Sequence, residues 1–282
     1  MPATLPDYLG LCSRGDTASL PEFNRVLVEN HPGSEFLFLD FEDEEFTAGE
    51  EESYYIWLEC GDISAEFNGN RQELRPGDVI ALGPDQSVAF FGRGKFWAIK
   101  SRTTQPLPFS GISSLSTLED TSGGCNNSEN AFRRLQVVWE DSQDPNNPDG
   151  ANIVGCHVIW IAAESSRSHY HPVPSSKGGI NQQEMYLVLD PKDFGLKGDC
   201  GTPGVWTYPE YGRWDEPCFT PLKPGDVFFI AAPAIHRAVD ILTCVVALPG
   251  FKPDNDRYID QDIYDQSNGQ APCNLNRVKK GL

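Results

Sequence analysis

The residues of this chain that could do chemistry gather between 168 and 195, where the sequence reads SHYHPVPSSKGGINQQEMYLVLDPKDFG. His169 and His171 are one residue apart, and on a strand this spacing sends both imidazoles to the same face. Glu184 opens an apolar run, and Tyr186 shares its face for the same reason. Imidazole and carboxylate are ligands of divalent first-row metals. The stretch therefore predicts part of a metal site, although a polar loop with two histidines would also fit it.

A repeated motif supplies a third histidine. LRPGDVIAL at 74–82 matches LKPGDVFFI at 222–230. In both copies Pro-Gly makes a tight turn, the Asp can accept hydrogen bonds from the turn's amides, and the apolar residues lead into a strand. His236 follows the second copy at the start of another strand, whereas the first copy has Val88 at the equivalent position. The first half also lacks a His-x-His, so the duplication predicts one metal site, in the second half.

We therefore expect three imidazoles and one carboxylate to hold one divalent transition metal, Zn, Mn, Fe or Ni, with one face left open for a substrate. The expected ligands are His169, His171, Glu184 and His236. Gln182 and Gln183 are the alternatives to Glu184, but neither leads as directly into the apolar run. Of the two remaining histidines, His31 is expected in a turn and His157 in the packing of an apolar strand.

Short strand-like segments follow one another along the whole chain. They are rich in aromatic and β-branched residues and are bounded by Gly, Pro, Asp or Asn. Helical periodicity is weak, and 128–140 is compatible with a short helix or with a strand. A Glu-x-Tyr also opens a strand in each half, at Glu52 and at Glu184, and this is a second sign of the duplication. We expect an all-β chain with two similar domains, 1–118 and 151–282, joined by a polar linker at 119–150.

Charge and composition narrow the choice of partners. The chain has 282 residues, with 41 acidic and 22 basic side chains and a net charge of −19. Nucleic acid and anionic membranes are bound mainly through Lys and Arg, so neither is an expected partner. A small-molecule substrate is expected, and the sequence is compatible with a homo-oligomer. The polar tail at 254–270 is expected to be solvated surface.

Apolar segments and cysteine spacing indicate the cellular location. No window holds 18 apolar residues, and the N terminus has neither a basic start nor an apolar core typical of a signal peptide. The eight cysteines are widely spaced and include no C-x-x-C. We expect a cytoplasmic protein with reduced thiols.

The combined pattern resembles the cupin superfamily, in which His-x-His and Glu form one motif and Pro-Gly-Asp…His forms a second. The resemblance implies two jelly-roll domains of the double-stranded β-helix type, with the metal in the second. The gap between His-x-His and Glu is usually short in that superfamily, whereas here PVPSSKGGINQQ intervenes. The segments AAESSRSHYHP, QQEMYLVLDPKDFG and DEPCFTPLKPGDVFFIAAPAIH are similar to the 5-deoxy-glucuronate and 5-keto-4-deoxyuronate isomerase group of bicupins, which has a long gap at this point. This chain lacks the proline that the group has just before its first histidine.

The resemblance implies an aldose–ketose type isomerase that acts on a uronate or related sugar acid through a metal-stabilised enediolate. Tyr186 is then the expected donor to a substrate oxygen, and Glu164 is the expected base. Lys177 is expected to pair with a substrate carboxylate. A non-haem iron dioxygenase of the cupin superfamily is the alternative, because a site of three histidines and one glutamate suits that chemistry too.

Overall fold

The structure is a computed structural model, and strands predominate in it, as expected from the sequence. It describes residues 5–16, 18–103, 106–107, 109–118, 133–138, 155–161, 166–175, 179–196, 202–252 and 254–280. The strands are β1 (Leu9–Ser13), β2 (Ser34–Glu42), β3 (Glu45–Thr47), β4 (Glu52–Phe67), β5 (Asn70–Glu73), β6 (Val79–Leu82), β7 (Ser87–Arg102), β8 (Gly111–Ser113), β9 (Arg133–Val138), β10 (Gly155–Ile161), β11 (His169–Tyr170), β12 (Gln183–Val188), β13 (Gly204–Tyr208), β14 (Cys218–Pro221), β15 (Asp226–Ile230), β16 (Ile235–Val239), β17 (Ile241–Leu248) and β18 (Arg257–Tyr258). The helices are α1 (Ser19–Asn30), α2 (Asp260–Gln266), α3 (Leu275–Lys280) and the 3₁₀ turns η1 (Leu115–Thr117) and η3 (Pro191–Phe194).

The first half forms one sheet in the order β2-β7-β4-β6-β8, with β3 added to β7 and β5 added to β4. The long strands β4 and β7 pair along most of their length, with a bulge between Leu58 and Cys60. Gly61 follows the bulge, where a side chain would not fit: a Cβ there would lie 2.5 Å from the carbonyl oxygen of Arg93 on β7. The glycine therefore keeps β4 paired through its bend instead of ending it.

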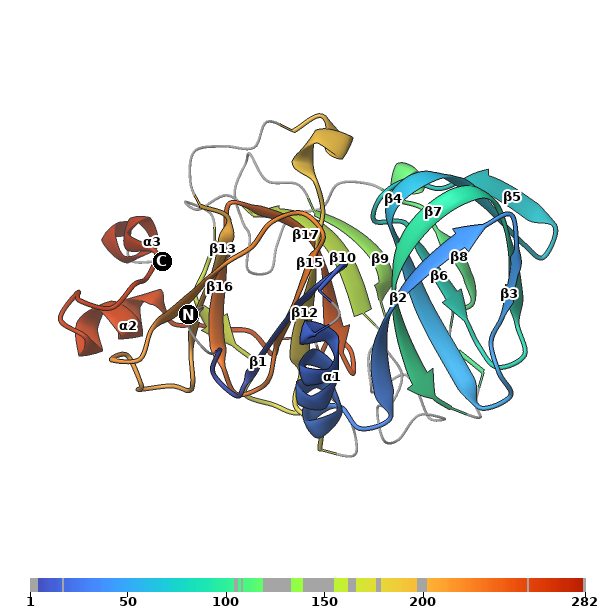
Figure 1. The fold of residues 1–282 in the computed structure, drawn as a ribbon. Helices are drawn as coiled ribbons and strands as arrows, with labels where there is room; N and C mark the ends of the chain where they lie inside the picture. The colour runs from blue at the N-terminus through green and yellow to red at the C-terminus, as the bar shows by residue number, and fades with distance from the viewer. Residues whose placement is uncertain are drawn as a thin grey trace.

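The second half forms two sheets, which Figure 1 shows on the side of the molecule that carries both termini. One has the order β1-β15-β12-β17-β10-β9, and the other has the order β14-β13-β16-β11-β18. Apolar side chains from both sheets, among them Phe228 of β15 and Val205 of β13, form a common buried core. The two sheets thus face each other across the interior in which the expected ligands lie.

Successive side chains of β12 point to opposite faces of the sheet. One face packs against the first half, and the other faces the interior of the second half. Met185 and Leu187 are fully buried in a core that also contains Trp57 of the first half. Tyr186 belongs to the interior core of the second half, and Glu184 shares its face because the side-chain period of a strand is two. The expectation that these two residues lie on one face is confirmed.

Helix α1 is not among the elements predicted from the sequence. Phe23, Val26 and Leu27 recur at helical spacing and are buried, and Arg25 on the exposed face forms ion pairs with glutamates one turn away on each side. The pattern is present in the sequence but short. None of the helices in the described ranges is both long and apolar enough to cross a membrane.

Two strands join the second-half sheet from outside the expected second domain. The sequence pattern assigns 9–13 to the first domain and 133–138 to the linker. In the structure β1 pairs with β15, with Leu9 opposite Ile230, and β9 pairs with β10. Figure 1 shows β1, in dark blue, lying among the strands of the second half. Directly after β1, Arg14 donates to Glu59 of the first half at 2.7 Å, so this segment connects the two halves.

Candidate metal centre

The four expected ligands come from both sheets of the second half. Glu184 is on β12 of the six-stranded sheet, whereas His169 and His236 are on the paired strands β11 and β16 of the other sheet. His169 and His236 are directly opposite each other, so their side chains point to the same side. His171 follows β11, on the same face as His169. All four side chains are buried, with exposed fractions between 2% and 6%.

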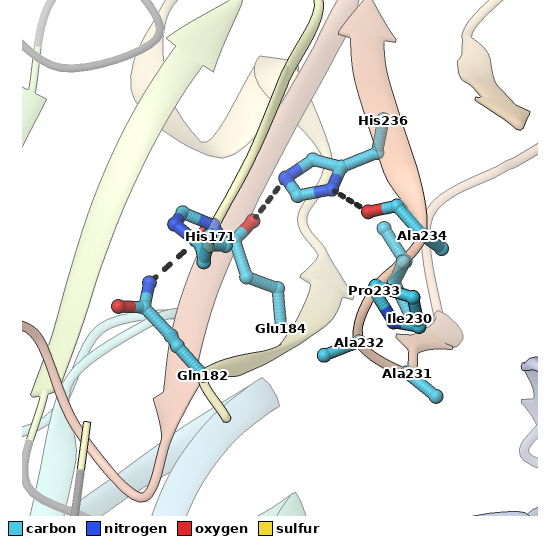
Figure 2. A pocket seen from close by; sticks show the side chains of 9 residues that line it. All are labelled: His171, Gln182, Glu184, Ile230, Ala231, Ala232, Pro233, Ala234 and His236. Atoms are coloured by element: carbon cyan, nitrogen blue, oxygen red, sulfur yellow. Dashed lines mark hydrogen bonds and ion pairs between the residues drawn. The ribbon is translucent and has the colours of Figure 1, made fainter. Parts of the chain in front are cut away.

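The carboxylate of Glu184 lies between two of the imidazoles. Its Oε1 is 3.1 Å from Nε2 of His171, and its Oε2 is 3.1 Å from Nε2 of His236, as Figure 2 shows for His236. One donor atom from each of the four ligands, His169 included, lies within 4.8 Å of the other three. Nε2 of His236 is buried and makes no hydrogen bond of good geometry in spite of its short distance to the carboxylate. A buried imidazole nitrogen without a hydrogen-bond partner, close to a carboxylate, fits a shared cation, and three imidazoles with one carboxylate fit a divalent transition metal.

Each imidazole has a second nitrogen, Nδ1, that faces an oxygen of the chain. The contacts are His169 with the carbonyl oxygen of Arg167 at 3.1 Å, His236 with that of Ala234 at 3.4 Å, and His171 with Oδ1 of Asp256 at 3.2 Å. Such contacts hold the proton on Nδ1 and leave Nε2 free to bind a metal.

Burial and neighbouring charges set the protonation of the group. Desolvation, assisted by repulsion from His236, lowers the pKa of His169 to about 4. Burial lowers the pKa of His171 as well, but Asp256 and Glu184 outweigh it and raise that pKa to about 9. Burial raises the pKa of Glu184, but the adjacent imidazoles outweigh it and hold it well below its ordinary value. The cluster therefore combines an ionised carboxylate with a neutral imidazole, and His171 would release a proton on binding a cation.

Asp256 belongs to the site, although its sequence context predicts solvated surface. It lies just before β18, which pairs with β11 beside His169. Its side chain is 34% exposed, and its Oδ2 accepts a hydrogen bond from the hydroxyl of Tyr258 at 2.9 Å. Burial raises the pKa of Asp256, but the close contact with His171 and the charge of the nearby imidazoles lower it below its ordinary value. The sequence signal was the spacing of Asp256 and Tyr258, two residues apart, which places both side chains on one side of an extended chain.

Tyr186 and the two glutamines lie around the cluster. The hydroxyl of Tyr186, which is 1% exposed, donates to Oε2 of Glu184 at 3.0 Å. Nε2 of Gln182 is 3.5 Å from Nε2 of His171, and Gln183 turns away to accept a hydrogen bond from the amide of Ala232. Glu184 therefore lies between two of the histidines, whereas Gln182 contacts His171 alone and Gln183 points away. The role of Tyr186 as a donor to substrate stays a prediction.

Other expected residues lie elsewhere. Glu164, Lys177 and the side chain of His157 are outside the described residues. His31 caps the C-terminal end of α1 in a turn, as expected, and its Nδ1 is 2.8 Å from Oγ of Ser34.

Strand register identifies what the first half has in place of a ligand. Leu82 and Ile230 end the two copies of the repeated motif, and they pair with Tyr54 and Glu184 respectively. Tyr54 therefore occupies the place of Glu184. The Glu-x-Tyr that begins at Glu52 is consequently shifted by two residues from the Glu-x-Tyr that begins at Glu184. A tyrosine and a valine replace a carboxylate and an imidazole in the first half.

Comparisons with known proteins agree with this architecture. No protein-family model matches the sequence, and neither does any curated protein. Among solved structures, vicilin from Corylus avellana (hazelnut) has a TM-score of 0.57 at 10% identity, over 98% of each chain. Oxalate decarboxylase from Lactobacillus farciminis in its formate complex has a TM-score of 0.52 at 10% identity, over 88% of this chain and 90% of that one. The E. coli protein YlbA has a TM-score of 0.50 at 14% identity, over 88% of this chain and 87% of that one. The fold is that of the cupins.

The expected all-β cupin architecture is thus confirmed. At these identities the likeness concerns the fold alone. A cupin fold shared by vicilin and oxalate decarboxylase does not select a function. The chemistry of the buried cluster, and not the fold, distinguishes between functions.

Proposed function

We propose that this cupin protein is a metal-dependent enzyme that isomerises a uronate or a related sugar acid. The observation that carries the proposal is the convergence of His169, His171, Glu184 and His236, whose donor atoms lie within 4.8 Å of one another in a buried site. A divalent metal bound there would act as a Lewis acid on the carbonyl and adjacent hydroxyl of the sugar. The long segment between the second histidine and Glu184 favours the uronate isomerase group over other cupins.

Residues of this chain would orient the metal ligands and transfer the proton of the substrate. Tyr186 donates to Oε2 of Glu184 and so keeps the carboxylate directed at the histidines. Isomerisation of an aldose to a ketose also needs a base that moves a proton between adjacent carbons, and Glu164 is our proposed base. Lys177 is proposed to pair with the substrate carboxylate. Both assignments rest on the sequence.

The walls of the site restrict water. Ile230, Ala231, Pro233 and Ala234 line one side of the pocket beside Glu184, as Figure 2 shows. Their apolar side chains leave the buried carboxylate, the imidazoles and the amide of Gln182 as the polar groups available to a substrate. Exclusion of water would protect a carbanion-like intermediate from side reactions.

The test begins with elemental analysis of protein purified without added metal. A stoichiometric divalent metal, lost when His169 and His171 are both changed to Ala, is expected. The metal-loaded protein should then interconvert 5-keto-4-deoxyuronate or 5-deoxy-glucuronate with its isomer in the absence of oxygen. Iron in the site together with substrate-dependent oxygen uptake would instead support the dioxygenase. An unchanged metal content in the double variant would move the metal site elsewhere.

A further inference from the structure

Arg167 places a positive charge beside the metal centre. Within the part of the chain that the structure describes, its guanidinium forms no ion pair, and its Nε is buried without a hydrogen-bond partner. Its described contact is with the ring of Tyr258, where Cζ lies 4.5 Å from the ring centroid. In a chain with 41 acidic and 22 basic residues, most arginines are expected to have a carboxylate partner, and Arg167 does not have one among the described residues.

The backbone around Arg167 is tied to the site. Its carbonyl oxygen faces Nδ1 of His169 at 3.1 Å. The next residue, Ser168, donates to Asp260 through its amide at 3.1 Å and its hydroxyl at 2.7 Å, and its carbonyl accepts from Ile259 at 2.9 Å. The position of Arg167 relative to His169 is therefore fixed by buried hydrogen bonds.

The ring of Tyr258 is close both to the guanidinium and to one of the ligands. It is directly opposite His169 in the pairing of β18 with β11, so its ring is on the imidazole's side, and the two ring centroids are 6.0 Å apart. Its hydroxyl is held by Asp256, whose other oxygen faces His171. The negative charge of Asp256 is thus directed at the metal centre and leaves Arg167 unneutralised.

The residues beside Arg167 are more exposed than the ligands. The four ligands are at most 6% exposed, whereas Tyr258 is 41% exposed and the side chain of Asp256 is 34% exposed. A small molecule that approaches the ligands over β18 would pass Arg167 and Tyr258.

We propose that Arg167, seated on the ring of Tyr258, is a binding site for the carboxylate of a small anionic substrate whose other end reaches the metal centre. The inference rests on the proposed function, because it needs a substrate that reacts there, and it assigns the substrate carboxylate to Arg167 instead of Lys177. A guanidinium presents a planar fork of donors that matches a carboxylate, and stacking on an aromatic ring orients the fork in advance. The site therefore selects acids over neutral sugars of the same size.

The experiment compares the binding of glucuronate and glucose to the full-length, metal-loaded protein by titration calorimetry. Arg167→Met is expected to weaken glucuronate binding by about ten- to hundredfold and to leave glucose unaffected. Arg167→Lys should retain part of the affinity, because it keeps the charge and loses the fork. Arg71→Met is the matched control, since Arg71 also lies over an aromatic ring, that of Phe91, but in the first half. Metal content is measured on each variant to show that the centre is intact.

Equal glucuronate affinity in wild type and Arg167→Met would overturn the inference. So would the failure of glucuronate, galacturonate and lactate to bind the wild-type protein. Turnover is measured separately. Carboxylate binding that depends on Arg167 without isomerisation would support the binding site and reject the isomerase. Isomerisation with binding that does not depend on Arg167 would do the reverse.

Discussion

Oδ1 of Asp256 lies 3.2 Å from Nδ1 of His171, while the other ring nitrogen of His171 lies 3.1 Å from Glu184. The imidazole is therefore held between an outer and an inner carboxylate. A carboxylate behind a metal-binding histidine fixes the ring's orientation and tautomer and increases its basicity. A residue of the C-terminal tail thus acts on a ligand that the sequence places far from it.

Asp256→Asn should weaken metal binding by about ten- to hundredfold, because the amide removes the charge behind His171 while keeping the size of the side chain. The affinity is measured by competition with a chelator, and the absorption spectrum of the Co²⁺-loaded protein reports the ligand geometry. Asp254→Asn is the matched control, because Asp254 has a left-handed backbone, φ 56°, that asparagine adopts readily. Equal chelator competition by both variants would contradict a role for Asp256 at the centre.

Tyr186→Phe should lower the free energy of unfolding by about 1.5–3 kcal/mol, because it removes a buried hydrogen bond to a carboxylate. It should also weaken metal binding, since Glu184 loses the donor that orients it. The first half supplies a control: the hydroxyl of Tyr54 donates to Oε2 of Glu52 at 2.8 Å, but this carboxylate is 38% exposed. Tyr54→Phe should cost less than Tyr186→Phe in denaturant titrations and leave metal binding unchanged. The opposite order would show that the Tyr186 bond has no special role.

The ligand face and the repeat could be predicted because both depend on short-range geometry. Alternation along β12 put Glu184 and Tyr186 on one face. The Pro-Gly-Asp turn predicted that its aspartate would accept from the turn's amides, and Asp226 does so from Lys223 at 2.9 Å. The corresponding bond in the first half runs from the amide of Arg75 to Asp78.

The features that were missed depend on contacts between distant segments. The pairing of β1 with β15 is set by packing between the two ends of the chain, and the strand pattern around Leu9 suits either sheet. Asp256 has the same polar surroundings in the sequence as a solvated residue, and its contact with His171 exists only once β18 has paired with β11. The equivalence of Tyr54 and Glu184 is likewise a property of strand pairing. The two Glu-x-Tyr motifs in the sequence could not reveal it.

Leu9→Ala tests whether β1 belongs energetically to the second half. Leu9 is 3% exposed and packs in the interior core with Phe228 and Ile230. Removing a buried leucine side chain should cost about 2–5 kcal/mol of unfolding free energy and lower the denaturant concentration at which metal is released. Leu11→Ala, at a half-buried position of the same strand, should cost less. Metal release that is unaffected by Leu9→Ala would mean that β1 is dispensable for the second half.

The buried Asp78 should give the protein a stability that falls as the pH rises. Burial raises the pKa of Asp78, and hydrogen bonds from the amides of Leu115 and Arg75 oppose the increase only in part. Because the folded protein holds this proton more tightly than the unfolded chain, whose aspartates titrate near 3.9, the contribution is complete below that pH and is lost as the pH rises through the folded pKa.

Asp78→Asn removes this titration and replaces an acceptor by an NH₂ group, which should cost about 1–3 kcal/mol at neutral pH. The difference in unfolding free energy between wild type and variant should therefore grow as the pH falls from 7 towards 4, because the other groups titrate equally in both proteins and cancel. Urea titrations at several pH values measure the difference. A difference that shrinks on acidification would mean that the pKa of Asp78 is lowered by its amide donors, so that the hydrogen bonds at the Pro-Gly-Asp turn outweigh burial.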